Sequence, residues 1–207
     1  MTSMNEMAQG FQRFSREVFP AQAALFKKLA TTHQPTALFI GCSDARVVPE
    51  LITQTDPGEL FVIRTAGNLV PPYTQGADGV AASIEYAIGV LGVTDVIVCG
   101  HSACGAMTAL ASGSDLTGLP AVATWLHHAD ASKARTDAVE HPAGTERVAA
   151  LVKDNVLAQL ANLKTHPSVA KALVQRKVTL HGWVYDIGSG SAEMLDTQSG
   201  RFTALAA

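Results

Sequence analysis

The sequence predicts an α/β fold: a mostly parallel β-sheet flanked by helices, with an antiparallel edge strand and an N-terminal helical arm. Four short apolar runs, rich in β-branched and aromatic residues, are bounded by turn residues, as buried strands are. Segments whose apolar residues follow helical spacing separate these runs. Near-continuous apolar strands that alternate with helices are typical of a parallel sheet covered on both faces.

Composition indicates one well-packed domain spanning residues 1–207. The chain is 47% hydrophobic and 16% charged, which is enough apolar material for a core. Its formal net charge is −3, and its basic residues are intermixed with acidic ones and form no basic face. Neither nucleic acid nor an anionic membrane is therefore an expected partner. We find no signal segment and no run of about 18 apolar residues. Three cysteines do not make a disulfide framework, so we expect a cytoplasmic protein.

The apolar spacing in residues 1–34 predicts a helical arm, which precedes an α/β core over residues 35–207. Apolar residues at helical spacing define its first helix, namely Met7, Phe11, Phe14 and Val18. Pro20 is expected to interrupt this helix, and a second one should cover residues 21–31. The apolar face of such an arm must lie on something, either this domain or a second subunit.

The core elements follow in order along the chain. Strands are predicted at 36–41, 60–65, 93–100 and 178–187, and helices at 78–92 and 146–166. Residues 192–197 should pair with the last strand as a hairpin across "GSGS", which gives the antiparallel edge. The stretch 112–145 has mixed character and is expected to be surface helix and loop.

Two of the predicted strands end in residues that can bind a metal ion. "CSDAR" follows the first strand and "GHSACG" follows the third, at the strand ends where functional residues of α/β sheets gather. An extended backbone sends Cys42, Asp44 and Arg46 to one side. A strand-to-helix turn can bring His101 and Cys104 onto one centre. Thiolate and imidazole are ligands that zinc favours, so the two loops predict a zinc site if their strands are near neighbours.

The residues alone do not decide what occupies the fourth position of this site. Asp44 could close it, or Arg46 could hold that carboxylate aside and admit water. Cys99 lies within an apolar run and is predicted to be a packed strand cysteine. "GHSACG" and "GCSDA" both lack the last glycine of a G-x-S-x-G nucleophile elbow. "GSGS" lacks the G-x-G-x-x-G pattern, so a dinucleotide site is not supported.

The pattern C-x-D-x-R, followed about 55 residues later by G-H-S-x-C-G, resembles the signature of β-class carbonic anhydrases. The resemblance covers nearly the entire chain and includes "PGELFVIRTAGNLVPPY", "SIEYA" and "HGWVYDI". It is closest to the bacterial enzyme associated with cyanate degradation, and to the plant-type branch more broadly.

This resemblance implies that Cys42, His101 and Cys104 bind one Zn²⁺ per chain, with water or hydroxide in the fourth position. It also implies that Asp44 pairs with Arg46. The implied activity is zinc-dependent, reversible hydration of carbon dioxide to bicarbonate and a proton, by attack of zinc-bound hydroxide. Two thiolates should leave the zinc-bound water less acidic than imidazoles would, so activity is expected to rise toward alkaline pH.

The resemblance further implies an apolar substrate pocket at a dimer interface, and hence a homodimer or an assembly of dimers. Phe61, Tyr86 and the backbone amide of Gly105 would line it. In plant-type relatives a glutamine nine residues before the first zinc cysteine donates to substrate. His33 stands there in this chain, followed by Gln34, so either the histidine is the donor or the backbone shifts.

The other branch of the family has a bicarbonate regulatory pocket built with a tryptophan three residues before that cysteine. Phe39 occupies this position, so no such regulation is expected, although Arg64 and Tyr185 are present.

Three rival functions share some of these residues. A hydrolase of similar molecules, such as carbon disulfide, would have the same ligands and differ only in access. A non-catalytic zinc module would have Asp44 permanently on the metal, and the presence of Arg46 argues against it. A thiol redox protein is disfavoured because the chain has no C-x-x-C motif.

Overall fold

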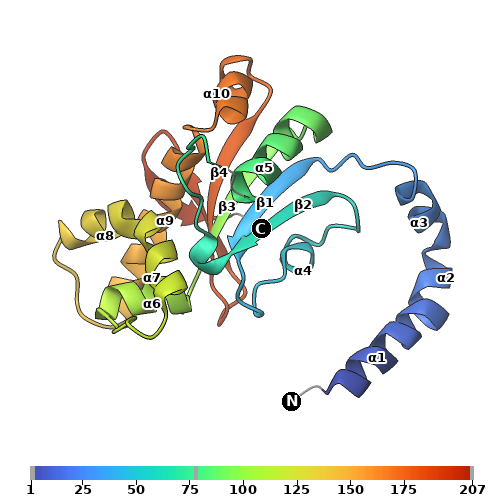
Figure 1. The fold of residues 1–207 in the computed structure, drawn as a ribbon, viewed down its shortest axis with the longest axis horizontal. Helices are drawn as coiled ribbons and strands as arrows, with labels where there is room; N and C mark the ends of the chain where they lie inside the picture. Colours follow the sequence, from blue (N-terminus) through green and yellow to red (C-terminus); the bar gives the residue numbers. More distant parts are fainter. Residues whose placement is uncertain (1–2, 77–78, 206–207) are drawn as a thin grey trace. The chain divides into compact units, whose positions relative to one another are not determined.

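The computed structural model of the chain describes residues 3–76 and 79–205 (Figure 1). It forms two compact units, Met1–Gln34 and Pro35–Ala207. The N-terminal unit is helical throughout most of its length, in α1 (Met4–Arg13), η1 (Phe14–Val18), α2 (Phe19–Ala21) and α3 (Ala23–Leu29). Ser3 and Glu6 cap its start reciprocally, because each side chain bonds the other's backbone N–H.

The prediction that Pro20 interrupts the first helix is wrong. The helix continues from α1 through the π-helical turn η1 into α2, where Pro20 occupies the first turn. Pro20 has no N–H to donate to the preceding turn, and the backbone before it takes the wider π-helical form of η1 instead of ending. The backbone instead breaks at Gln22 (φ −111°, ψ 14°), so the second helix begins at Ala23.

The second unit contains a six-stranded sheet in the order β2-β1-β3-β4-β5-β6. Its strands are β1 (Ala37–Cys42), β2 (Leu60–Thr65), β3 (Asp95–His101), β4 (Thr179–Tyr185), β5 (Ala192–Asp196) and β6 (Arg201–Ala204). The first four are parallel, and β5 runs antiparallel to β4, which confirms the predicted fold class. Strand β6 was not predicted from the sequence; it is short and largely exposed, and it extends the antiparallel edge.

Strand β1 pairs directly with β3, in a register that sets Gly41 beside Cys99. The "CSDAR" and "GHSACG" segments therefore leave the sheet from the ends of adjacent parallel strands. This adjacency is the condition that the predicted metal site required.

Helices and short helical turns connect the strands. They are α4 (Pro49–Thr53), η2 (Ala66–Asn68), α5 (Gly79–Tyr86), η3 (Ala87–Leu91), α6 (Gly105–Ser112), α7 (Pro120–Leu126), η4 (His127–Ala129), α8 (Asp130–Asp137), α9 (Thr145–Leu163) and α10 (Pro167–Val174). The predicted helices 78–92 and 146–166 correspond to α5 with η3 and to α9; residue 78 lies outside the described residues. Among residues 3–76 and 79–205, no helix combines the length and apolarity that crossing a membrane requires.

The stretch 112–145 is helix and loop, as predicted, but it is not all surface. Ser132 and Thr136 of α8 are buried. The Ser132 hydroxyl donates to the Asn155 side chain of α9, and the Thr136 hydroxyl donates to Asp154. These contacts tie α8 to α9, which a pattern of exposed and apolar residues does not reveal.

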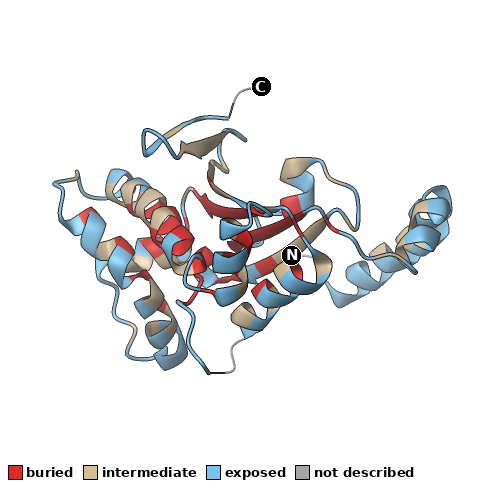
Figure 2. Cartoon of the chain, turned by 90° about the horizontal axis from the view of Figure 1, so that it is seen from above, coloured by how far each residue is buried: buried red, intermediate tan, exposed pale blue. Residues whose placement is uncertain are grey.

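Side chains of the sheet alternate between two apolar layers, and Figure 2 shows the buried positions concentrated along the strands and the helices against them. On β1, Leu38 and Ile40 join one layer while Phe39 joins the other. Helix α9 packs closely on the first layer, because β3 and β4 have glycines beneath it. A β-carbon at Gly182 would lie 2.8 Å from Val156 Cγ1, and one at Gly100 would lie 2.9 Å from Val152 Cγ1.

Candidate metal centre

Cys42, His101 and Cys104 meet at the carboxyl end of the sheet. Their potential ligand atoms all lie within 4.8 Å of one another. All three residues are buried, with exposed fractions of 6%, 0% and 1%. Cys42 ends β1, His101 ends β3, and Cys104 stands immediately before α6, so two adjacent strands and one turn hold the three donors.

The His101 ring is oriented for metal binding. Its Nδ1 lies 2.9 Å from the Ser102 carbonyl oxygen. With the Nδ1–H donating to that oxygen, the other ring nitrogen keeps its lone pair. This Nε2 is buried and has no hydrogen-bond partner in the part of the chain that the structure describes. A buried nitrogen without a partner is costly, and a metal ion would satisfy it.

The ionisation of each thiol depends on the other. The pKa of Cys42 is lowered, chiefly because the Cys104 thiol hydrogen-bonds to it. That same bond, with burial, raises the pKa of Cys104. One thiol therefore ionises at the expense of the other, and a cation between them allows both to be thiolates. Two thiolates and one imidazole match the donor preference of zinc, so these residues fit that ion.

Asp44 lies beside this group but is held by Arg46. The guanidinium donates from Nε to Oδ1 (2.9 Å) and from Nη2 to Oδ2 (2.7 Å), and the Arg46 backbone N–H also donates to Oδ1. These bonds keep the pKa of Asp44 well below its usual range. Nη2 also donates to the Ala103 carbonyl, which links the two ligand loops. Asp44 Oδ2 lies 4.0 Å from His101 Nε2, beyond hydrogen-bond reach.

Arg64 of β2 fixes the backbone of the "CSDAR" segment. It donates to the carbonyl oxygens of Cys42 (3.0 Å), Asp44 (2.6 Å) and Val47 (2.7 Å). From the sequence, Arg64 was considered only in connection with bicarbonate regulation, and this role was missed. The pairing of β1 with β2 puts Arg64 beside Gly41, and no local pattern signals it.

The predicted pocket residues fall in different places. Gly105 begins α6 next to Cys104, with open space where a β-carbon would be. The rings of Phe61 and Tyr86 contact each other, with centroids 6.0 Å apart. Phe61 is paired with Leu38, four residues before Cys42, which places it about 13 Å along the strand from that donor residue of its own chain.

His33 lies in the N-terminal unit, in the segment without regular secondary structure after α3, and its role remains a prediction.

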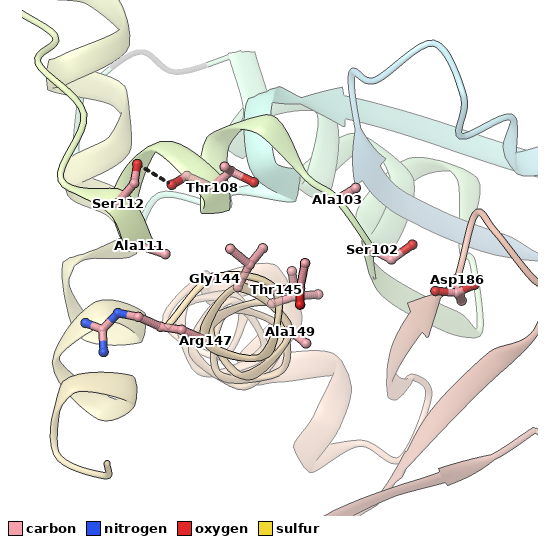
Figure 3. A pocket seen from close by; sticks show the side chains of 12 residues that line it. Ser102, Ala103, Thr108, Ala111, Ser112, Gly144, Thr145, Arg147, Ala149 and Asp186 are labelled. Carbon is pink, nitrogen blue, oxygen red and sulfur yellow. Dashed lines mark hydrogen bonds between the residues drawn. The ribbon is translucent and has the colours of Figure 1, made fainter. Parts of the chain in front are cut away.

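A cavity of about 570 Å³ borders the turn between β3 and α6 without including the three donor residues (Figure 3). Ser102 and Ala103 line it from the turn, and Ala149 lines it from α9. Two of its polar side chains are already engaged: Ser102 Oγ accepts from the Ile187 N–H, and Asp186 Oδ1 accepts from Ser189. The cavity thus offers no donor set comparable to the metal centre.

Comparison with known proteins decides the family. A family model described as carbonic anhydrase matches residues 37–192, which include all three donor residues. The fold superimposes on the β-carbonic anhydrase CcaA with a TM-score of 0.94 and 40% identity, covering 99% of this chain and 92% of that one. The chain belongs to the β-class carbonic anhydrases. It is 60% identical over 203 residues to a carbonic anhydrase of Pseudomonas aeruginosa, covering 98% of this chain and 92% of that protein.

Carbonic anhydrase 1 of Escherichia coli O157:H7 is 53% identical over 204 residues, covering 99% of this chain and 93% of that one. A Coccomyxa β-carbonic anhydrase in complex with acetazolamide gives a TM-score of 0.82 at 27% identity, over 94% and 87% of the two chains. β-Carbonic anhydrases are zinc lyases that hydrate carbon dioxide. The predicted enzyme class, reaction and metal are therefore confirmed.

We predict that zinc content distinguishes the three cysteines of this carbonic anhydrase. Cys42→Ser and Cys104→Ser should lose most bound zinc, because each removes a thiolate. Cys99→Ala should keep about one ion per chain. Cys99 is buried in the layer with Phe39, and burial raises its pKa to about 12, so it is a packed strand cysteine as predicted.

Zinc is measured by atomic emission on dialysed protein, with circular dichroism as the test of folding. Loss of zinc from folded Cys99→Ala, or its retention in Cys42→Ser, would contradict the assignment.

Proposed function

We propose that Cys42, His101 and Cys104 hold the zinc ion with which this carbonic anhydrase hydrates carbon dioxide to bicarbonate and a proton. The observation that carries the assignment is the convergence of three buried donors within 4.8 Å, one of them an unpartnered imidazole nitrogen among the described residues. A zinc ion held by these residues supplies the Lewis acidity that activates water, more weakly with two thiolates than with imidazoles alone.

Asp44 and Arg46 then control the reacting water. The bidentate bonds from Arg46 keep Asp44 ionised and occupy both of its oxygens, so this carboxylate would not itself be a ligand of a bound zinc ion. Asp44 accepts a hydrogen bond from the nucleophile and orients its lone pair toward the carbon of carbon dioxide. This arrangement disfavours the closed zinc module, in which the carboxylate would itself be a ligand.

The substrate pocket is proposed to form between two chains. Phe61 and Tyr86 form one aromatic pair, yet the strand register puts Phe61 about 13 Å along the strand from Cys42 of the same chain. Two-fold pairing would bring the pair of one chain to the metal centre of another, where Gly105 supplies a backbone N–H. The substrate donor is proposed to be His33, or Gln34 if the backbone shifts by one residue. Two β-carbonic anhydrases of the filamentous ascomycete Sordaria macrospora are tetrameric, which supports an assembly of chains here.

We place this chain in the plant-type branch, with the bacterial cyanate-associated enzyme. Phe39 is fully buried in one layer with Ile97 and Cys99, and Arg64 is engaged by three carbonyl oxygens. Both features support the absence of bicarbonate regulation. Three cysteines without disulfides support a cytoplasmic location. Sigmoidal inhibition by bicarbonate would argue against the branch assignment.

The rate of carbon dioxide hydration is expected to increase between about pH 7 and about pH 8.5. Two thiolates weaken the acidity of the metal, so the nucleophile ionises more fully on the alkaline side. Stopped-flow assays at both pH values, on protein of known zinc content, check this. A rate that is already flat below about pH 7 would contradict it. Stoichiometric zinc without hydration would instead favour the carbon disulfide hydrolase.

Arg46→Gln is expected to lower kcat/KM by about 100-fold, because Asp44 loses its fixed position. Arg46→Lys keeps the charge but not the two parallel bonds, so its loss should be intermediate. Arg135→Gln is the control, because it removes a guanidinium about as exposed as that of Arg46, which bonds the carboxylate of Asp154. Equal kcat/KM for Arg46→Gln and the control would show that the Asp44 pairing has no catalytic role.

Sedimentation velocity is expected to give a particle of at least two chains. An active monomer would contradict a pocket completed by a second chain.

Tyr86→Ala should lower activity with no change in zinc content, because the ring is proposed to line the substrate and not to bind the metal.

A further inference from the structure

The turn that follows β2 reaches the metal centre through one backbone group. The N–H of Gly67 donates to the Cys42 sulfur, at 3.4 Å. Gly67 has a left-handed conformation (φ 73°, ψ 20°), and a β-carbon there would lie 3.1 Å from Ala106 Cβ and 3.1 Å from Met107 Cε. Only glycine fits between the strand of one ligand and the helix that follows another.

The peptide groups on both sides of Gly67 are held by side chains from distant helices. Trp125 Nε1 of α7 donates to the Ala66 carbonyl (2.9 Å), which belongs to the same peptide plane as the Gly67 N–H. Asn155 Nδ2 of α9 donates to the Gly67 carbonyl (2.9 Å). Both peptide groups of Gly67, the residue that donates to Cys42, are therefore fixed by a side-chain hydrogen bond.

The orientation of Asn155 is set by its own neighbours. The residue is fully buried, and its Oδ1 accepts from Ser132 Oγ (3.0 Å) and from Gln159 Nε2 (2.9 Å). With two donors on the oxygen, the amide nitrogen must face the Gly67 carbonyl. Close packing of α9 on the glycines of β3 and β4 sets the depth from which Asn155 reaches the turn.

The same face of α9 holds the turn further along, away from the sulfur. Gln159 Oε1 accepts from the Val70 N–H (2.8 Å), and Asn162 Nδ2 donates to the Val70 carbonyl (2.8 Å). Asn162 thus makes the same kind of contact as Asn155, from the same helix to the same turn, but at Val70 instead of Gly67. This gives a matched control within the chain.

We propose that Trp125 and Asn155 are positioning residues for the metal centre, which aim the Gly67 N–H at the Cys42 sulfur and so hold this ligand in place for zinc. The inference rests on the proposed zinc ligands. Hydrogen bonds to a metal ligand orient it, and loss of such an outer partner lowers metal affinity by about 10- to 100-fold. Nothing in the role requires Trp125 or Asn155 to touch substrate.

The test measures zinc release to a chelator and the visible spectrum of the cobalt-substituted full-length protein, neither of which depends on catalysis. Trp125→Phe removes the indole donor and keeps an aromatic ring, and Asn155→Ala removes the amide. Each should accelerate zinc release by about 10-fold. Each should also move the thiolate-to-cobalt charge-transfer band to longer wavelength, because a sulfur without its N–H donor holds its electrons less tightly. Asn162→Ala should change neither.

The outcomes separate this inference from the proposed ligand set. If the unsubstituted protein binds no zinc and shows no charge-transfer band, the ligand assignment fails and the inference fails with it. If that protein shows both but Asn162→Ala matches Asn155→Ala, the face of α9 has only a general structural role and the inference is overturned. Should Asn155→Ala not fold, Trp125→Phe decides: unchanged release and an unchanged band overturn the proposal.

Discussion

The direct parallel pairing of β1 with β3 is the interaction on which the metal centre depends. Cys42 and His101 are the last residues of these neighbouring strands, so the hydrogen bonds of the sheet set the distance between them. Both strands are buried on each face, which leaves no room for a shift in register, because a one-residue slip would exchange the two apolar layers. A rigid sheet thereby holds donors that lie 59 residues apart in the chain.

Polar side chains of α9 extend this rigidity into the turn after β2. That turn contains two consecutive left-handed residues, Gly67 and Asn68, and such a backbone persists only where its surroundings hold it. The buried amides of Asn155 and Gln159 satisfy its peptide groups, which would otherwise be unpaired away from water. The apolar face of α9 packs on the sheet, and its polar face makes hydrogen bonds to the turn beside the site.

The two arginines beside the centre bond different kinds of partner. Arg46 balances Asp44 and also bonds the Ala103 carbonyl, so a single guanidinium joins both ligand loops. Arg64, one strand away, donates to three backbone oxygens and stabilises the loop conformation itself. Two arginines next to two buried thiols thus have separate functions: one positions a carboxylate, and the other positions the chain that carries it.

Local patterns in the amino-acid sequence were enough to predict five of the six strands, the long helices, the three candidate metal donors and the Asp44–Arg46 pair. Those features are encoded in apolar periodicity and in motifs at strand ends. Only the folded chain reveals that Arg64, Trp125 and Asn155 serve the centre, because their partners lie 17 to 88 residues away and no spacing signals such contacts. The fold likewise sets Phe61 and Tyr86 away from the donors of their own chain, since strand register is a property of the assembled sheet.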